Sequence, residues 1–185
     1  MKRNLLLLTL LSTLLTAAPS NQDEQAIAKG NEISSALLQK LGGEVKAKMQ
    51  AGGPLAAVHF CSQNALVLTD ELAKQTHTGI KRVSLKNRNP VNAADTEEQE
   101  ILRKWEKMTA TGESLPPYEF KRTTDNKSIF YKPIVLNNEA CLKCHGELAA
   151  GSDVAATIRS LYPDDKATGY KMGDLRGMIV ITLPQ

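Results

Sequence analysis

Residues 118–136, YEFKRTTDNKSIFYKPIVL, have the pattern of two strands joined by a short loop. The two segments 118–123 and 128–136 alternate in the way that half-buried strands do. Between them, Thr124-Asp125-Asn126-Lys127 is rich in turn-forming residues and predicts a hairpin loop. We therefore expect an antiparallel hairpin in the second half of the chain.

An extended helical region precedes this hairpin. Over residues 23–50, apolar residues recur at helical spacing with charged residues between them, which predicts an amphipathic helix that is weakened or kinked at Gly42-Gly43. The glycine pair at 52–53 ends this helix. A second helix, over residues 54–75, then begins with a proline, which is favoured in a first helical turn.

The remaining elements complete a single domain. Thr96 and Gln99 have the spacing of a capping box at the start of a helix that runs to residue 108. Residues 80–85 and 178–183 predict two more strands, and residues 154–161 predict a short helix. Helices followed by antiparallel strands indicate an α+β domain, which we assign to residues 21–185.

Residues 1–20 have the three parts of a secretory signal peptide. Two basic residues lie near the start, an apolar run covers residues 5–15, and small residues lead to Ser20, after which we expect cleavage. The run is shorter than the about 20 apolar residues that span a bilayer, so we expect no stable membrane insertion after cleavage. An uncleaved membrane anchor is the alternative.

The charge balance excludes one class of partner. The chain has 23 Lys and Arg residues against 20 Asp and Glu residues, and loss of Lys2 and Arg3 with the signal peptide leaves a nearly neutral protein. Binding to nucleic acid depends on a surplus of basic side chains that neutralise phosphates. We therefore expect no nucleic-acid partner.

Residues 141–145, CLKCH, form the attachment signature of a c-type haem. In such sites both thiols, here Cys141 and Cys144, form thioethers with the haem vinyl groups, and the histidine, here His145, is the proximal iron ligand. The alternatives are a zinc site, which would need a second ligand pair, a thioredoxin-like dithiol and a structural disulfide. Bacteria attach haem covalently outside the cytoplasm, so this motif and the signal peptide together predict a periplasmic protein with one covalent haem c.

Cys61 is the third cysteine of the chain. It shares one helix face with four apolar residues, Val58, Ala65, Leu68 and Leu72. His59, two residues earlier, is rotated from Cys61 by about 200° around the helix. An unpaired thiol in an oxidising compartment persists when it is buried or ligated, so the helix pattern leaves Cys61 as either a small core residue or a metal ligand.

Six stretches, taken together, resemble a known family. They are Cys61 followed by Ala65, RVSLKNRNPVN at 82–92, YKPI at 131–134, CLKCHG at 141–146, YPDDKATGY at 162–170 and GDLRG at 173–177. Their order and spacing are similar to those of the PAS-like c-type haem domain family, formerly a domain of unknown function. Members of that family are soluble periplasmic cytochromes or extracytoplasmic sensor domains.

The resemblance implies a PAS-like fold, in which helices flank a central antiparallel sheet. It also implies an axial pair formed by the histidine of the haem motif and a cysteine of the early helix, which here are His145 and Cys61. The other candidates for the sixth position are an open site or one of four side chains, Met172, Met178, His59 and His77.

Two arginines are candidates for binding the cofactor. Arg82 and Arg88 lie with Lys86 in the basic segment 82–92, and their charge would neutralise haem propionates or a cysteine thiolate. Several aromatic side chains are predicted either to line the haem or, by default, to fill the apolar core: Phe60, Trp105, Tyr118, Phe130 and Tyr131.

These observations predict a periplasmic c-type cytochrome that transfers electrons to or from an unidentified redox partner protein. An anionic cysteine ligand would give its iron a low potential. The alternative is a haem-based redox or small-ligand sensor that works with a separate signalling protein. We do not expect an enzyme, since a six-coordinate iron leaves no site for substrate, although weak peroxidase activity is a remaining alternative.

Overall fold

The computed structural model describes residues 21–184, so the predicted signal peptide lies outside the described residues. The elements are the helices α1 (Asn21–Thr76), α2 (Thr96–Ala110), α3 (Glu139–His145) and α4 (Asp153–Leu161), the strands β1 (Gly79–Val83), β2 (Glu119–Arg122), β3 (Ser128–Val135) and β4 (Leu175–Leu183), and the 3-10 turn η1 (Pro90–Asn92). Within the described range, no helix combines the length and apolar character needed to cross a membrane.

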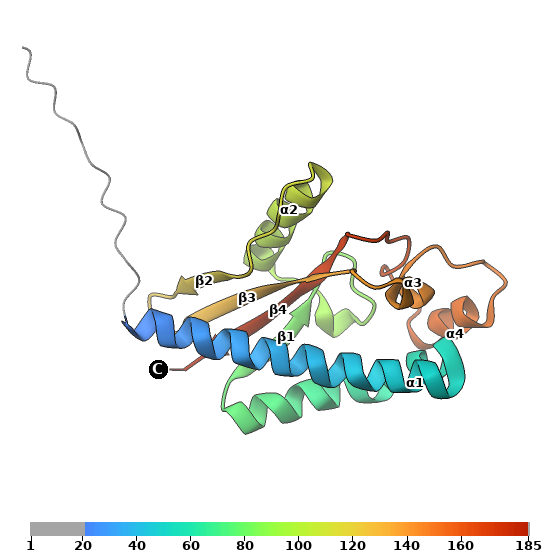
Figure 1. Ribbon diagram of the computed structural model, residues 1–185, viewed down its shortest axis with the longest axis horizontal. Coiled ribbons are helices and arrows are strands. Elements are labelled where there is room, and N and C mark those ends of the chain that lie inside the picture. The colour runs from blue at the N-terminus through green and yellow to red at the C-terminus, as the bar shows by residue number, and fades with distance from the viewer. Residues whose placement is uncertain (1–20, 185) are drawn as a thin grey trace, which may run out of the picture.

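The four strands form one antiparallel sheet in the order β1-β4-β3-β2. The predicted hairpin is confirmed, because Arg122 pairs with Ser128 at its closed end. The last strand, β4, lies between β1 and β3, with Ile181 opposite Phe130. Figure 1 shows this sheet with the long helix α1 on one side and α2 on the other. The architecture is α+β with helices flanking a central antiparallel sheet, as the PAS-like resemblance implied.

Helix α1 contains a sharp break at Gly52-Gly53, where the backbone leaves helical geometry. Gly53 has a φ of 68°, a left-handed conformation that glycine adopts without steric cost. The predicted break here and the new start at Pro54 are thus confirmed. A kink at Gly42-Gly43 is not present, because the helix continues through these exposed residues. Each interior glycine costs about 1 kcal/mol of helix propensity, which a long docked helix tolerates.

The break folds α1 into two arms, a first arm over residues 21–51 and a second arm over residues 54–76. An ion pair between Lys40 and Glu71, 3.5 Å long, joins the arms, and Leu41 and Ala65 share one buried cluster. In Figure 1 the second arm turns back and runs beside the first toward β1. The arms therefore form a helical hairpin, and the second arm, which carries Cys61, packs against the first arm.

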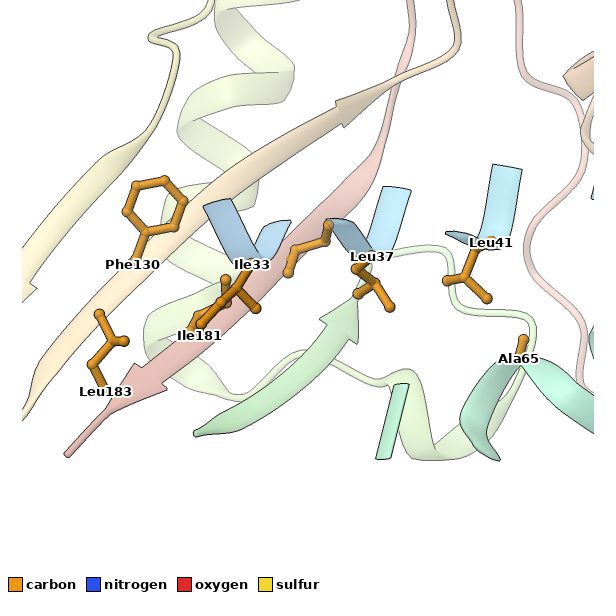
Figure 2. Packing of buried hydrophobic residues seen from close by; sticks show 8 residues of the cluster. Ile33, Leu37, Leu41, Ala65, Phe130, Ile181 and Leu183 are labelled. Atoms are coloured by element: carbon orange, nitrogen blue, oxygen red, sulfur yellow. The ribbon is translucent and has the colours of Figure 1, made fainter. Parts of the chain in front are cut away.

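The sheet separates two apolar clusters, because neighbouring residues of a strand point to opposite faces. Phe130 belongs to the cluster on the α1 side, and the next residue, Tyr131, belongs to the cluster on the α2 side. Figure 2 shows the α1-side cluster, which consists of Ile33, Leu37, Leu41, Ala65, Phe130, Ile179, Ile181 and Leu183. The α2-side cluster consists of Val83, Ala94, Leu102, Trp105, Tyr131, Leu175, Met178 and Val180. Trp105, Phe130 and Tyr131 are therefore core residues.

Helix α2 begins with a capping box one residue earlier than predicted. Asp95 is the N-cap, and its carboxylate accepts a hydrogen bond from the Glu98 backbone at 3.0 Å, while the Glu98 side chain accepts one from the Asp95 backbone at 2.9 Å. The predicted box of Thr96 and Gln99 is wrong, since the Gln99 amide instead donates to the Ala94 carbonyl. Asp95, the residue before Thr96, has a short side chain whose carboxylate accepts hydrogen bonds from the start of the helix.

Helices α3 and α4 lie together beyond one end of the sheet, near the turn of the α1 hairpin (Figure 1). Helix α4 agrees with the prediction for residues 154–161, and the Ser152 side chain caps it. Helix α3 carries the CLKCH motif and was not predicted as a helix. Its N-cap is Asn138, whose side chain accepts a hydrogen bond from the Ala140 N–H at 2.8 Å. This end of the sheet contains the candidate site.

Candidate cofactor site

Helix α3 presents its three chemically active residues on one face. Cys141, Cys144 and His145 stand at positions i, i+3 and i+4 of a regular helix, and such positions are neighbours on the helix surface. Both cysteines are half-buried free thiols. Cys141 and Leu142 pack against a small apolar cluster that consists of Leu136, Ala167 and Tyr170. The motif therefore packs against apolar side chains of the protein and is not surrounded by solvent.

The His145 ring is fixed in one orientation and one tautomer. Its Nδ1 lies 2.8 Å from the carbonyl oxygen of Ala167. A carbonyl only accepts hydrogen bonds, so Nδ1 carries the proton and Nε2 keeps the free lone pair of the neutral ring. Burial lowers the pKa of His145 well below its usual range, and the nearby charges of Arg176 and Arg88 lower it further. A neutral imidazole with a free Nε2 is the form that ligates a metal.

The loop of residues 165–170 holds His145 through backbone contacts as well. The Tyr170 N–H donates to the His145 carbonyl at 2.9 Å, and the Gly169 N–H donates to the Gly146 carbonyl at 3.1 Å. The Tyr170 ring stands edge-on to the imidazole, with 6.3 Å between ring centroids. From the segment after β1, Nζ of Lys86 donates to the Thr168 carbonyl at 2.6 Å. This loop therefore lies between α3 and the segment after β1 and is hydrogen-bonded to both.

Arg88 ties the same loop to the end of α3. Its Nε and Nη2 each lie 3.1 Å from one carboxylate oxygen of Asp165, and this two-pronged ion pair is buried, with side-chain exposures of 11% and 7%. Its Nη2 also donates to the carbonyls of Cys144, at 2.6 Å, and Ala167, at 3.2 Å. A cation at the carboxyl end of a helix also stabilises the helix dipole. Direct contact of Arg88 with a cofactor stays a prediction.

Cys61 faces this region from the second arm of α1. It is half-buried whereas His59 is exposed, in agreement with the predicted helix faces. Burial raises the pKa of the Cys61 thiol, and the charges of Arg82 and Arg88 oppose this rise. Burial also raises the pKa of Cys144, to which a charge on Cys61 adds. The fold therefore places Cys61 and Cys144 within range of the same charge, that of Arg88.

Arg82 contributes an unsatisfied donor to the same region. Its Nε is the one buried side-chain nitrogen or oxygen in residues 21–184 that has no hydrogen-bond partner in the protein. Burial lowers the pKa of Arg82, while Cys61 and Tyr162 raise it. A buried donor without an acceptor is costly, so such a group indicates a missing partner. A carboxylate of a bound cofactor or a cysteine thiolate has the chemistry to fill this role.

The other candidate iron ligands are either exposed or fully buried. His59 and His77 are exposed, and Met172 is 45% exposed in a loop. Met178 is fully buried in the α2-side cluster. Of the five candidates for a sixth ligand, Cys61 is the one that is half-buried and within range of the charges of Arg82 and Arg88.

These residues fit a haem. A haem supplies four nitrogen ligands of its own, so the protein has to add one or two axial ligands and, for the covalent type, two thiols. The site offers Nε2 of His145, the thiol pair of α3 and the third thiol of α1, with the Nε–H of Arg82 as an unpaired donor. Across residues 21–184, no group of three or more His, Cys, Asp or Glu side chains is arranged to hold a bare metal ion.

Sequence reasoning missed the groups that hold His145 in place. Arg176 donates to the Ser84 hydroxyl at 3.0 Å and to the Lys86 carbonyl at 3.1 Å, and it lies over the Tyr170 ring. Tyr170 and Arg176 belong to the motifs at 162–170 and 173–177, whose side chains had no predicted role. Two surface clefts have volumes of about 530 and 360 Å³, and the smaller one is lined in part by Lys86 and Tyr170.

The comparisons with known proteins agree with the motifs. A family model described as Tll0287-like matches residues 13–184. The crystal structure of the cyanobacterial haem protein Tll0287 resembles this chain with a TM-score of 0.63 at 20% identity, covering 90% of this chain and 98% of that one. At this identity the likeness shows the shared fold alone. The search of curated proteins found no match. The chain belongs to the Tll0287-like family.

Proposed function

We propose that this protein is an exported c-type cytochrome that carries one covalent haem and transfers electrons. The observation that carries the proposal is the fixed His145, whose Nδ1 is bonded to the Ala167 carbonyl so that Nε2 is free, next to two half-buried thiols at attachment spacing. The solved relative Tll0287 is described as a haem protein, which supports the same cofactor here. Bound haem would supply a one-electron iron couple.

Each residue of the site has a defined part in this proposal. Cys141 and Cys144 hold the porphyrin through thioethers, and His145 ligates the iron through Nε2. Cys61 would supply a thiolate as a second protein ligand; burial raises the pKa of its thiol, so the charges of Arg82 and Arg88 and of the iron would have to favour deprotonation. Arg82 donates its unpaired Nε–H to the thiolate or to a propionate and neutralises that charge. The thiolate favours ferric iron, so the potential is low, and the arginine moderates this effect.

Mass spectrometry tests the covalent cofactor. Protein made in cells that can mature c-type cytochromes should retain the mass of one haem after denaturation, whereas Cys141→Ala with Cys144→Ala should lose it. A wild-type protein with the mass of the bare polypeptide would contradict the proposal. The same spectrum would give the mass of the exported chain and test the predicted cleavage after Ser20.

Electron paramagnetic resonance tests the sixth ligand. The ferric wild type should give low-spin signals of the thiolate type, and Cys61→Ala should abolish them and raise the midpoint potential. His59→Ala, a change on the exposed face of the same helix, is the matched control and should alter neither signal nor potential. If the thiolate signals are absent from wild type, or survive in Cys61→Ala, then Cys61 is only a core residue.

The second candidate function is a haem-based sensor, which the PAS-like arrangement of sheet and helices favours. A fold by itself does not determine function, so the site has to decide between the two. Carbon monoxide added to the reduced protein separates them. An electron carrier should keep both axial ligands and exclude the gas, whereas a sensor should release Cys61 and bind it.

A further inference from the structure

We propose that Arg88 and Asp165 are positioning residues that set the redox potential of the site by acting in opposite directions on His145. This inference rests on the proposed function. It concerns the effect of the Arg88–Asp165 ion pair on the Ala167 carbonyl, which orients the imidazole of His145.

The geometry connects the ion pair to the imidazole through a single atom. The Ala167 carbonyl oxygen accepts from His145 Nδ1 at 2.8 Å and also from Arg88 Nη2 at 3.2 Å. Asp165 accepts from Nε and from the same Nη2 of the guanidinium, each at 3.1 Å, and one oxygen of its carboxylate accepts from the Ala167 N–H at 2.9 Å. The ion pair therefore contacts both the carbonyl and the N–H of Ala167, the residue whose carbonyl orients His145.

The guanidinium weakens the hydrogen bond that His145 donates. A carbonyl that already accepts from a cation offers less electron density to a second donor, so the Nδ1–H bond polarises the imidazole less. A stronger Nδ1–H bond makes the ligand more basic and favours ferric iron. Arg88 therefore raises the potential through this bond, and its buried positive charge acts in the same direction.

Asp165 works against this effect. Its carboxylate faces the guanidinium almost without solvent, at 7% exposure, so it compensates the positive charge locally. It also draws the guanidinium toward itself and thereby limits the pull on the Ala167 carbonyl. Removing only Asp165 should leave an uncompensated cation, and removing only Arg88 should leave an uncompensated anion.

The test is the midpoint potential of the haem-loaded protein, measured by spectroelectrochemical titration in four variants. Arg88→Met should lower the potential, and Asp165→Asn should raise it. The double variant should return close to wild type, because both charges are gone. Asp164→Asn removes a carboxylate from the exposed neighbouring residue and is the matched control, for which solvent screening predicts a much smaller shift.

The opposite signs distinguish charge balance from simple loss of packing. Shifts of both single variants in the same direction, or shifts no larger than that of Asp164→Asn, would overturn the inference while leaving the cytochrome proposal intact. If Arg88→Met fails to fold, Arg88→Lys replaces it; lysine keeps the charge but loses the two-pronged contact, so the potential should still shift downward. A wild type without covalent haem would overturn the proposed function and this inference with it.

Discussion

The packing of the long helix on the sheet makes Gly30 a site where an alanine should destabilise the protein. Gly30 is buried in the first arm of α1, directly over the ring of Phe130. A Cβ at Gly30 would lie 2.6 Å from Cδ2 and 2.8 Å from Cβ of Phe130, distances that real contacts do not show. Phe130 is fully buried and stacks on Tyr118 at a centroid distance of 5.2 Å, so the ring has no free space to move into.

Two effects of opposite sign decide the size of the change at Gly30. Alanine gains about 1 kcal/mol of helix propensity over glycine. Overpacking a well-packed core costs about 1–3 kcal/mol, and the closeness of the overlap with Phe130 puts this site at the upper end. The net loss should be about 2 kcal/mol, which for a chain of this size is a fall in melting temperature of about 4–8 °C.

Gly43→Ala is the matched control for Gly30→Ala. Gly43 lies in the same arm, is exposed, and has no atom within 4 Å of a built Cβ, so only the propensity gain of about 1 kcal/mol applies. Thermal and urea denaturation of the same form of the protein should move in opposite directions for the two variants. In Gly30→Ala, a further Phe130→Leu change should recover part of the loss, a coupling of at least about 0.5 kcal/mol. The reasoning is refuted if Gly30→Ala is as stable as Gly43→Ala.

Two further predictions concern helix docking and capping. Leu37→Ala should cost about 2–5 kcal/mol in urea denaturation, because Leu37 is fully buried between α1 and the sheet, whereas Leu38→Ala, at a residue that is 39% exposed, should cost well under half as much. Asp95→Ala should cost about 1 kcal/mol at pH 7 through loss of the α2 cap. The backbone hydrogen bond that Asp95 accepts lowers the pKa of its carboxyl below the ordinary 3.8. The stability it adds is therefore present above about pH 4 and is lost as pH falls through the lowered pKa, so titration of both proteins should show the gap closing in acid.

Local pattern predicted most of the fold, and local pattern also explains the errors. The strand and helix periods required no knowledge of distant residues, and each predicted strand or helix is present within a few residues. The two glycine pairs of α1 look alike in sequence, however, and only the pair at 52–53 breaks the helix. A following proline distinguishes that pair, whereas Gly42-Gly43 has no such signal. The position of the α2 cap was one residue wrong because Asp95 and Thr96 are both good capping residues.

The candidate site was only partly predictable. CLKCH is a contiguous signal, and the apolar face of Cys61 follows from helix periodicity. The contacts that fix His145 are long-range, because Ala167 lies 22 residues from His145 and Asp165 lies 77 residues from Arg88. No local pattern indicates that a backbone carbonyl will accept from an imidazole, or that an arginine will share that carbonyl. These contacts exist because the sheet brings the segments together.

The sheet order explains why the site lies at this end of the molecule. Val83, at the end of β1, pairs with Met178 near the start of β4, so the segment that carries Arg88 leaves the sheet where the loop of residues 165–170 enters it. Strand β3 ends beside the start of β4, where Val135 pairs with Leu175. The chain therefore leaves β3 toward α3 at the same end of the sheet. Three segments that are distant in sequence thus meet because β4 lies between β1 and β3. The register of β4 therefore positions His145, and the edge strand β2, which pairs only with β3 in the sheet, lies away from this arrangement.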